Sequence, residues 1–187
     1  MKYESGLFFV FTIWALFYSC TIYQENYDNP VDFEANQEKG IGNPAVVFYP
    51  KTQTKTIADS IVVESFIVFH PDSIYSFAGV HLQIEFPNVI LQLDTIRPGF
   101  FITDTNQTTP LFTYDYNGES IIDIYAYFLD TLKLELTGTG HLADIVFLPF
   151  SIGMDSVKYN LEFCKMINYQ DSTIVLNGER GCEVIIE

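Results

Sequence analysis

Apolar and polar residues alternate along most of the chain after residue 44, which is the pattern of half-buried β-strands. The alternation is clearest at residues 79–86, where every second residue is apolar: Val80, Leu82, Ile84 and Phe86. The same reading along the chain predicts strands at residues 45–49, 60–69, 79–86, 89–93, 111–116, 121–129, 141–150, 157–163, 173–176 and 182–186.

Turn residues separate these predicted strands. Asn117-Gly118 and Asn177-Gly178 are typical of tight turns between strands, and Gly138-Thr139-Gly140 directly precedes the strand at 141–150. Nine or ten short strands at this spacing indicate an all-β sandwich or jelly roll. No helical segment of 10–15 residues alternates with them, which argues against a parallel α/β sheet. The only tryptophan, Trp14, lies outside the strands, which argues against an immunoglobulin domain.

Composition indicates a folded domain, and the net charge argues against one class of binding partner. Hydrophobic residues make up 48% of the 187 residues and aromatic residues 16%, so a sizeable core can form. The net charge is -15, which repels phosphate backbones and disfavours nucleic-acid binding. That charge is compatible with cation binding, with a basic protein partner, or with solubility alone.

The N-terminus has the features of an export signal. Residues 7–18 are apolar but too few to span a bilayer, which needs about 20 residues. With Lys2 before them, they suit the apolar region of a secretory signal. Ser19-Cys20 follows at once and resembles the lipobox of bacterial lipoproteins, which implies lipidation of Cys20 and membrane attachment through that anchor only. Simple cleaved secretion and an uncleaved anchor are the alternatives.

The rest of the chain divides into a tether and one domain. We expect residues 1–19 to be the signal peptide and residues 20–43 to be the anchor cysteine with a flexible linker, because this stretch is acidic and has no clear period. Part of it could instead pack as an edge strand. The folded domain is expected at residues 44–187. Export places the protein at the cell envelope or outer surface.

Two cysteines fall within the predicted domain. Cys164 and Cys182 flank a predicted hairpin, and export permits a disulfide between them. The alternative is two buried free thiols that act as small apolar groups. No Cys/His spacing indicates a zinc site.

The order of motifs resembles the cohesin domain and its relatives in the carbohydrate-binding-domain-like superfamily. Five features carry the resemblance. The first three are a long strand at 60–69, a strand that contains Ala78-Gly79, and an Asn-x-apolar-Leu strand at 88–93 that is followed by Gly99. The last two are a Gly-x-Gly-x-Leu-Ala-x-Ile-x-Phe strand at 138–147 and a late turn at Asn177-Gly178. The resemblance covers residues 44–187. It implies a nine-stranded jelly-roll β-sandwich with a non-catalytic recognition role.

The resemblance also implies a binding face. Cohesins receive their partner, a dockerin, on a flat sheet face built from the third, fifth, sixth and eighth strands. The outward residues at the matching positions are His81, Gln83, Glu85, Asp123, Tyr125, Tyr127, Lys158 and Asn160. Such a face suits a protein partner, of dockerin type or another. Its tyrosines could equally stack on a polysaccharide, or the face could be an ordinary solvated surface of a structural envelope lipoprotein.

Catalysis and metal binding have weaker support. Carboxylates are plentiful, but no nucleophile elbow, phosphate-binding loop or His-Glu-x-x-His motif is present. His141 shares a strand phase with apolar residues and is expected at a turn edge or in the core. We therefore expect no enzyme and no resident cofactor. Residues 103–106 and 115–119 offer oxygen ligands that calcium accepts, although turn chemistry explains them as well.

Overall fold

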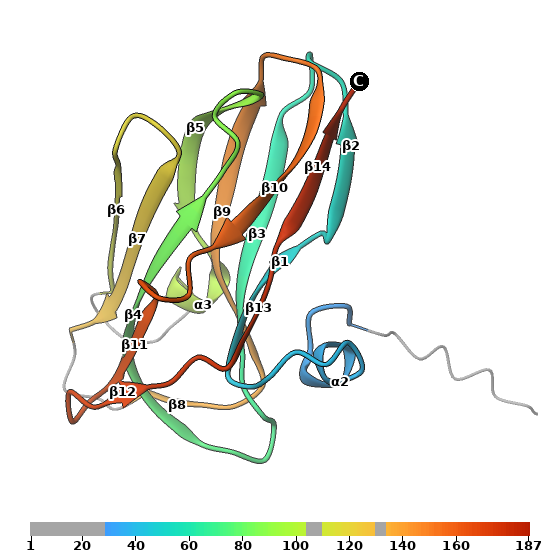
Figure 1. The fold of residues 1–187 in the computed structure, drawn as a ribbon. Helices are drawn as coiled ribbons and strands as arrows, with labels where there is room; N and C mark the ends of the chain where they lie inside the picture. The colour runs from blue at the N-terminus through green and yellow to red at the C-terminus, as the bar shows by residue number, and fades with distance from the viewer. Residues whose placement is uncertain (1–28, 104–109, 130–133) are drawn as a thin grey trace, which may run out of the picture.

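A computed structural model of the chain describes residues 29–103, 110–129 and 134–187 (Figure 1). Two β-sheets pack face to face around one core. The five-stranded sheet has the order β13 (Gly178–Arg180), β1 (Ala45–Tyr49), β3 (Ile61–Val68), β9 (Thr139–Pro149) and β5 (Leu91–Pro98). No helix in the described ranges is long and apolar enough to cross a membrane.

The second sheet is larger. Its main path runs through β12 (Thr173–Ile174), β11 (Lys165–Asn168), β4 (Tyr75–Glu85), β10 (Gly153–Tyr159), β14 (Cys182–Ile186) and β2 (Thr52–Lys55). The long β4 also pairs with β7 (Ile121–Phe128) and β8 (Leu134–Leu136), and β6 (Pro110–Tyr116) pairs with β7. This arrangement puts β10, β4, β7 and β6 on one continuous surface.

The alternating pattern forms these strands because one side of each is buried. Val80, Leu82 and Ile84 of β4 are at most 1% exposed, while the polar residues between them lie on the outer side. Their inner side chains pack against the other sheet, including Phe48 and Phe147. Burial of such apolar surface contributes about 25 cal/mol per Å2. The predicted all-β sandwich is confirmed.

The strand count differs from the nine that were expected. Fourteen strands are present in the described ranges, and the short ones β2, β8, β11 and β13 were not predicted. Each has three or four residues, too few for a period to be visible. The prediction at 157–163 was also displaced. β10 ends at Tyr159, where Asn160 O accepts from the backbone N–H groups of Phe163 and Cys164 and turns the chain. Phe163 is consequently 52% exposed.

The segment expected as a linker is folded from Pro30 onward, and this corrects the predicted boundary. Helix α2 (Phe33–Gln37) is capped by Asp32, whose Oδ1 accepts from Ala35 N at 2.9 Å. Val31 is buried on the outer side of the five-stranded sheet, together with side chains that the sandwich alone would expose: Ala45, Val47 and Val68. The domain therefore includes residues 30–43. Cys20, the expected signal peptide and the start of the expected linker lie outside the described residues.

The possible disulfide is not formed: Cys164 and Cys182 are both free and buried, which is the alternative of two buried thiols. Cys164 Sγ contacts the backbone of Gln83, at 3.4 Å from its N and 3.6 Å from its O. Cys182 lies in β14 opposite Val157, and its Sγ contacts Glu183 O at 3.6 Å. The two thiols are thus engaged by different parts of the sheet. Burial raises the pKa of each to about 11.

Candidate partner-binding face

The eight residues predicted for the binding face lie on one surface of the larger sheet. In the register of β4 and β7, His81 is opposite Tyr125 and Gln83 is opposite Asp123. Lys158 of β10 is opposite Glu85. Asn160 follows β10 and reaches the same surface, because its N donates to Gln83 O at 2.9 Å. The four strands β6, β7, β4 and β10 that the resemblance implied are adjacent in this order.

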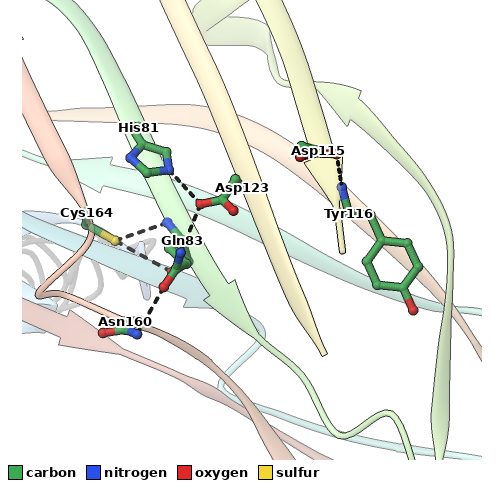
Figure 2. Close-up of polar contacts among 7 residues, drawn as sticks. All are labelled: His81, Gln83, Asp115, Tyr116, Asp123, Asn160 and Cys164. Carbon is green, nitrogen blue, oxygen red and sulfur yellow. Dashed lines mark hydrogen bonds and ion pairs between the residues drawn. The ribbon is translucent and has the colours of Figure 1, made fainter. Parts of the chain in front are cut away.

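A chain of polar contacts runs across the middle of this face (Figure 2). Asp123 Oδ1 lies 2.7 Å from His81 Nε2 and accepts from Gln83 Nε2 at 3.1 Å. Asn160 Nδ2 donates to Gln83 Oε1 at 3.1 Å and to Glu85 Oε1 at 3.3 Å. Lys158 Nζ is 3.4 Å from the other Glu85 oxygen. These contacts fix the rotamers of side chains from three elements before any partner arrives.

Two tyrosines give the face rigid aromatic area. The Tyr125 ring stacks on His81 with centroids 4.6 Å apart and planes 5° from parallel. Desolvation, with the negative charges of Asp123 and Asp115 nearby, raises the pKa of Tyr125, so its hydroxyl remains a neutral donor and acceptor. Tyr127 lies across Gly79 of β4, in the space that a side chain there would fill.

Five further outward residues were missed by the sequence reasoning. On β6, Leu111, Thr113 and Asp115 face the same way as the β7 residues opposite them. The Asn117-Gly118 turn could have shown which side chains of β6 face outward, because it sets which residues of β6 and β7 lie opposite each other. On β11, Lys165 and Ile167 pair with His81 and Gly79. Since β11 is only four residues long, no sequence signal reveals which of its residues face outward.

The register orders these side chains into rows across the sheet. One row is largely apolar: Leu111, Tyr127, Gly79 and Ile167. The next is mixed: Thr113, Tyr125, His81 and Lys165. The third is acidic and polar: Asp115, Asp123 and Gln83. The face therefore changes from apolar to acidic along the strand direction.

A small hollow of about 170 Å3 opens beside the Glu85–Lys158 pair, and its lining is Glu85, Phe86, Pro87, Ser120, Asp155, Ser156 and Lys158. Ligand pockets for organic molecules are usually about 300–1,000 Å3. The geometry suits contact with a broad partner surface better than enclosure of a small ligand.

The oxygens of the segment 115–119 serve its turn. Asn117 Oδ1 accepts from the N–H groups of Glu119 and Ile121, and Asp115 Oδ1 accepts from Tyr116 N. Within the described ranges, no group of three or more His, Cys, Asp or Glu side chains is close enough to hold a metal. Residues 104–106 of the other segment considered for calcium lie outside those ranges.

His141 lies far from the face, on the smaller sheet. Its ring stacks on Phe66 with centroids 4.8 Å apart, and its Nε2 is 2.9 Å from Asp144 Oδ1. Burial raises the pKa of the neighbouring Glu64 carboxyl, and the charge of Asp144 adds to the effect while His141 opposes it. A half-buried histidine packed on an aromatic ring agrees with the expected structural role.

Solved structures similar to this one are cohesin modules. A cohesin from Clostridium thermocellum, in a type I cohesin–dockerin complex, has a TM-score of 0.59 and 15% identity, covering 76% of this chain and 92% of its own. The sixth cohesin of scaffoldin B from Acetivibrio cellulolyticus, in complex with a dockerin, has a TM-score of 0.59 and 14% identity, covering 76% and 98%.

A cohesin module from a Clostridium perfringens family 33 glycoside hydrolase has a TM-score of 0.59 and 11% identity, covering 79% of this chain and 97% of its own. No family model matches the chain, and no curated protein sequence does. The likeness at these identities shows the fold, and the chain has a cohesin-like β-sandwich.

Proposed function

We propose that this chain is an exported, non-catalytic attachment module that binds a protein partner through the outer face of β6, β7, β4 and β10. The observation that carries the proposal is the fixed constellation of His81, Gln83, Asp123 and Asn160 beside two neighbouring tyrosines of β7. Side chains that are already ordered lose little entropy on binding. Tyrosine supplies large contact area with few rotatable bonds.

A dockerin-type module is the first partner to test. Two of the similar cohesins were solved in complexes with dockerins. The mixed apolar and acidic rows of this face would suit a partner that presents apolar side chains next to a basic group. Asp115 could receive the basic group of such a partner, since the only contact of its carboxylate among the described residues is with a backbone N–H.

Glycan binding is the second candidate, and one observation favours it. Tyr127 lies over Gly79, which exposes an aromatic ring on a flat surface of the kind that can pack against a sugar ring. A glycan site would lose binding in Tyr125→Ala or Tyr127→Ala, and free sugar would compete. A protein site would be insensitive to sugar.

The attachment role also includes the anchor. We propose that residues 1–19 direct export and that Cys20 carries the lipid. The segment that follows Pro30 packs on the outer side of the smaller sheet, so it leaves the opposite face uncovered for a partner. Metabolic labelling with a fatty-acid analogue, with Cys20→Ser as the control, tests this step.

The test of the partner is an affinity capture. Residues 21–187, which keep every described residue, serve as bait for the secreted and envelope proteins of the producing organism, with calcium or with EDTA. We expect capture of a protein with paired calcium loops that is lost in EDTA and weakened by Asp123→Ala. Gln92→Ala, an exposed residue of the opposite sheet, is the matched control and should change nothing.

Capture that the two variants affect equally would contradict the assignment to this face. Binding of polysaccharide without any protein partner would move the function to glycan recognition. Absence of both would leave a structural envelope role.

A further inference from the structure

Strand β6 forms an outer edge of the larger sheet, because it pairs with β7 and with no other described strand. Its hydrogen-bond phase follows from the turn, where Asn117 N donates to Ile121 O. Bonded pairs alternate in an antiparallel ladder, so Leu111, Thr113 and Asp115 exchange backbone bonds with β7. The N–H and C=O groups of the intervening residues, Phe112, Tyr114 and Tyr116, point to the open edge.

The neighbouring ladder gives the same phase. Phe86 N donates to Ser120 O, so the even-numbered residues of β7 bond to β4 and the odd-numbered ones bond to β6. Tyr116 N is already satisfied, because it donates to Asp115 Oδ1 at 2.9 Å (Figure 2). The backbone groups of Phe112 and Tyr114 have no partner among the described residues.

The other edges of the two sheets carry features that discourage pairing. β13 and β8 have three residues each and β12 has two, while β2 has four and includes Lys55. β5 has a register shift between Leu93 and Thr95 and carries Asp94 and Arg97. Short strands, bulges and charges are the usual protections of an edge. β6 differs: it has seven residues, no register shift, no basic residue, and proline only at its first position.

We propose that β6 pairs with β6 of a second copy of this chain, antiparallel about a two-fold axis at Thr113. Phe112 then lies opposite Tyr114 of the second copy, and the reverse pair is equivalent, so four backbone hydrogen bonds form. Asp115 lies opposite Leu111 of the second copy. The two Asp115 carboxylates stay about 14 Å apart along the strand, at about 3.4 Å per residue.

This register is preferred to its neighbours. A shift of two residues in one direction places Tyr114 opposite Pro110, which has no N–H to donate. A shift in the other direction requires Tyr116 N, which Asp115 already holds. Only the register centred on Thr113 pairs the open backbone groups of both Phe112 and Tyr114 in each copy without breaking an existing contact.

The dimer would carry two binding faces on one side. A two-fold axis between antiparallel strands of one sheet is perpendicular to that sheet, so the outer faces of both copies point the same way. If the proposed function holds, the dimer binds a repeated partner at both sites. Its overall affinity for that partner is then higher than that of one site, because the second site binds at a high effective concentration. The pairing itself does not depend on that function. Each copy has a net charge of -15, so added salt should favour association.

Sedimentation velocity on residues 21–187 from micromolar to millimolar concentration tests the pairing. We expect a reversible monomer–dimer equilibrium that shifts to dimer as salt is added. Tyr114→Pro removes only an N–H that faces the edge, which strands tolerate. It deletes two hydrogen bonds per dimer and should raise the dissociation constant by about tenfold or more. Circular dichroism checks that the variant remains folded.

A charge-matched pair of variants tests the register. Thr113→Lys places two lysines opposite each other at the two-fold axis and should weaken the dimer. Leu111→Lys adds the same charge opposite Asp115 of the second copy and should keep or strengthen it. A wild-type chain that stays monomeric at every concentration overturns the proposal. The proposal is also overturned if Tyr114→Pro leaves the dissociation constant of the dimer unchanged, or if Thr113→Lys and Leu111→Lys change it equally.

Discussion

Gly79 has a role at the residue scale because Tyr127 occupies the space above it. A Cβ built on Gly79 would lie 2.0 Å from Tyr127 Cδ1, far inside van der Waals contact. Glycine at this position therefore lets the tyrosine ring lie across β4 rather than stand away from it. The flat aromatic surface of the candidate face depends on this missing side chain.

Gly79→Ala should consequently displace the Tyr127 ring and lower the free energy of unfolding by about 1–3 kcal/mol, the usual cost of overpacking. In a Tyr127→Ala background the same substitution should cost little, because the clash is absent. Urea unfolding of the four chains of this double-mutant cycle measures the difference. Equal costs in both backgrounds would show that Tyr127 does not occupy this space.

The two buried thiols give a second prediction at this scale. Burial raises the pKa of Cys164 and Cys182 from 9.0 to about 11 in the folded chain. The folded state favours the neutral thiol, so this contribution to stability is complete below pH 9 and disappears as the pH rises through 11. We expect stability to fall between these values, by about 2 kcal/mol for each thiol.

Urea unfolding from pH 8 to pH 11 of residues 21–187 tests this fall. The control is Cys164→Ala with Cys182→Ala, which should reduce the fall and leave the part that comes from Tyr159, whose pKa burial also raises. At pH 8, iodoacetamide should label neither thiol in the folded chain and both in urea. Labelling of the folded chain at the unfolded rate would contradict their burial.

At the scale of elements, a buried arginine holds the N-terminal segment on the sandwich. Arg180 of β13 donates through Nη1 to Pro30 O and to Asn36 Oδ1, each at 3.1 Å, and through Nη2 to Phe48 O at 3.3 Å. Asn36 is itself buried and donates to Val31 O. Burial lowers the pKa of the Arg180 guanidinium. One side chain thus joins α2, β1 and β13.

Removal of this contact should loosen the whole segment. Arg180→Ala takes this donor from two buried oxygens, Asn36 Oδ1 and Phe48 O, at about 1–3 kcal/mol each, so we expect a loss of stability of that order. Hydrogen exchange should speed up more at residues 30–43, which open locally, than in the core strands β4 and β7. Lys39→Ala, in the exposed end of the same segment, is the control. A chain that starts at residue 44 should melt at a lower temperature than one that starts at residue 21.

At the scale of the whole molecule, the two sheets have different outer surfaces. Residues 31–41 cover part of the five-stranded sheet, whereas the outward residues of the candidate face on the larger sheet are half-buried or exposed. Figure 1 shows α2 beside the smaller sheet, away from β6 and β7. Residues 30–43 therefore lie on the side of the sandwich opposite to the proposed partner-binding face. This separation suits the proposed attachment module, because residues 30–43 do not compete for the binding surface.

Net charge also acts on the whole molecule. The net charge is -15, and the excess negative side chains repel one another more strongly in the compact folded state than in the extended unfolded chain. Added sodium chloride screens this repulsion, so the melting temperature of residues 21–187 at pH 7 should rise with salt. Near the sequence pI of about 4.3 the net charge is small, and the rise should shrink. A melting temperature that falls with salt at pH 7 would contradict this account.

Much of the fold was predictable from the sequence because a strand with one buried side has a period of two residues. The strands at 45–49 and 182–186 were placed without error, and the inward side of β4 was identified residue by residue. The outward phase of β4 and β7 then gave six members of the candidate face. Four strands of three or four residues were missed, because such a length carries no period.

The sequence by itself determined the all-β class, the inward and outward sides of the long strands, and the acidic charge, since these depend on local order and composition. Tertiary structure decided the rest. It placed Asn160 beside Gln83, kept Cys164 and Cys182 apart as free thiols, and folded residues 30–43 onto the smaller sheet. Each of these contacts joins residues far apart in the chain, and the pairing of strands across two sheets brings such residues together.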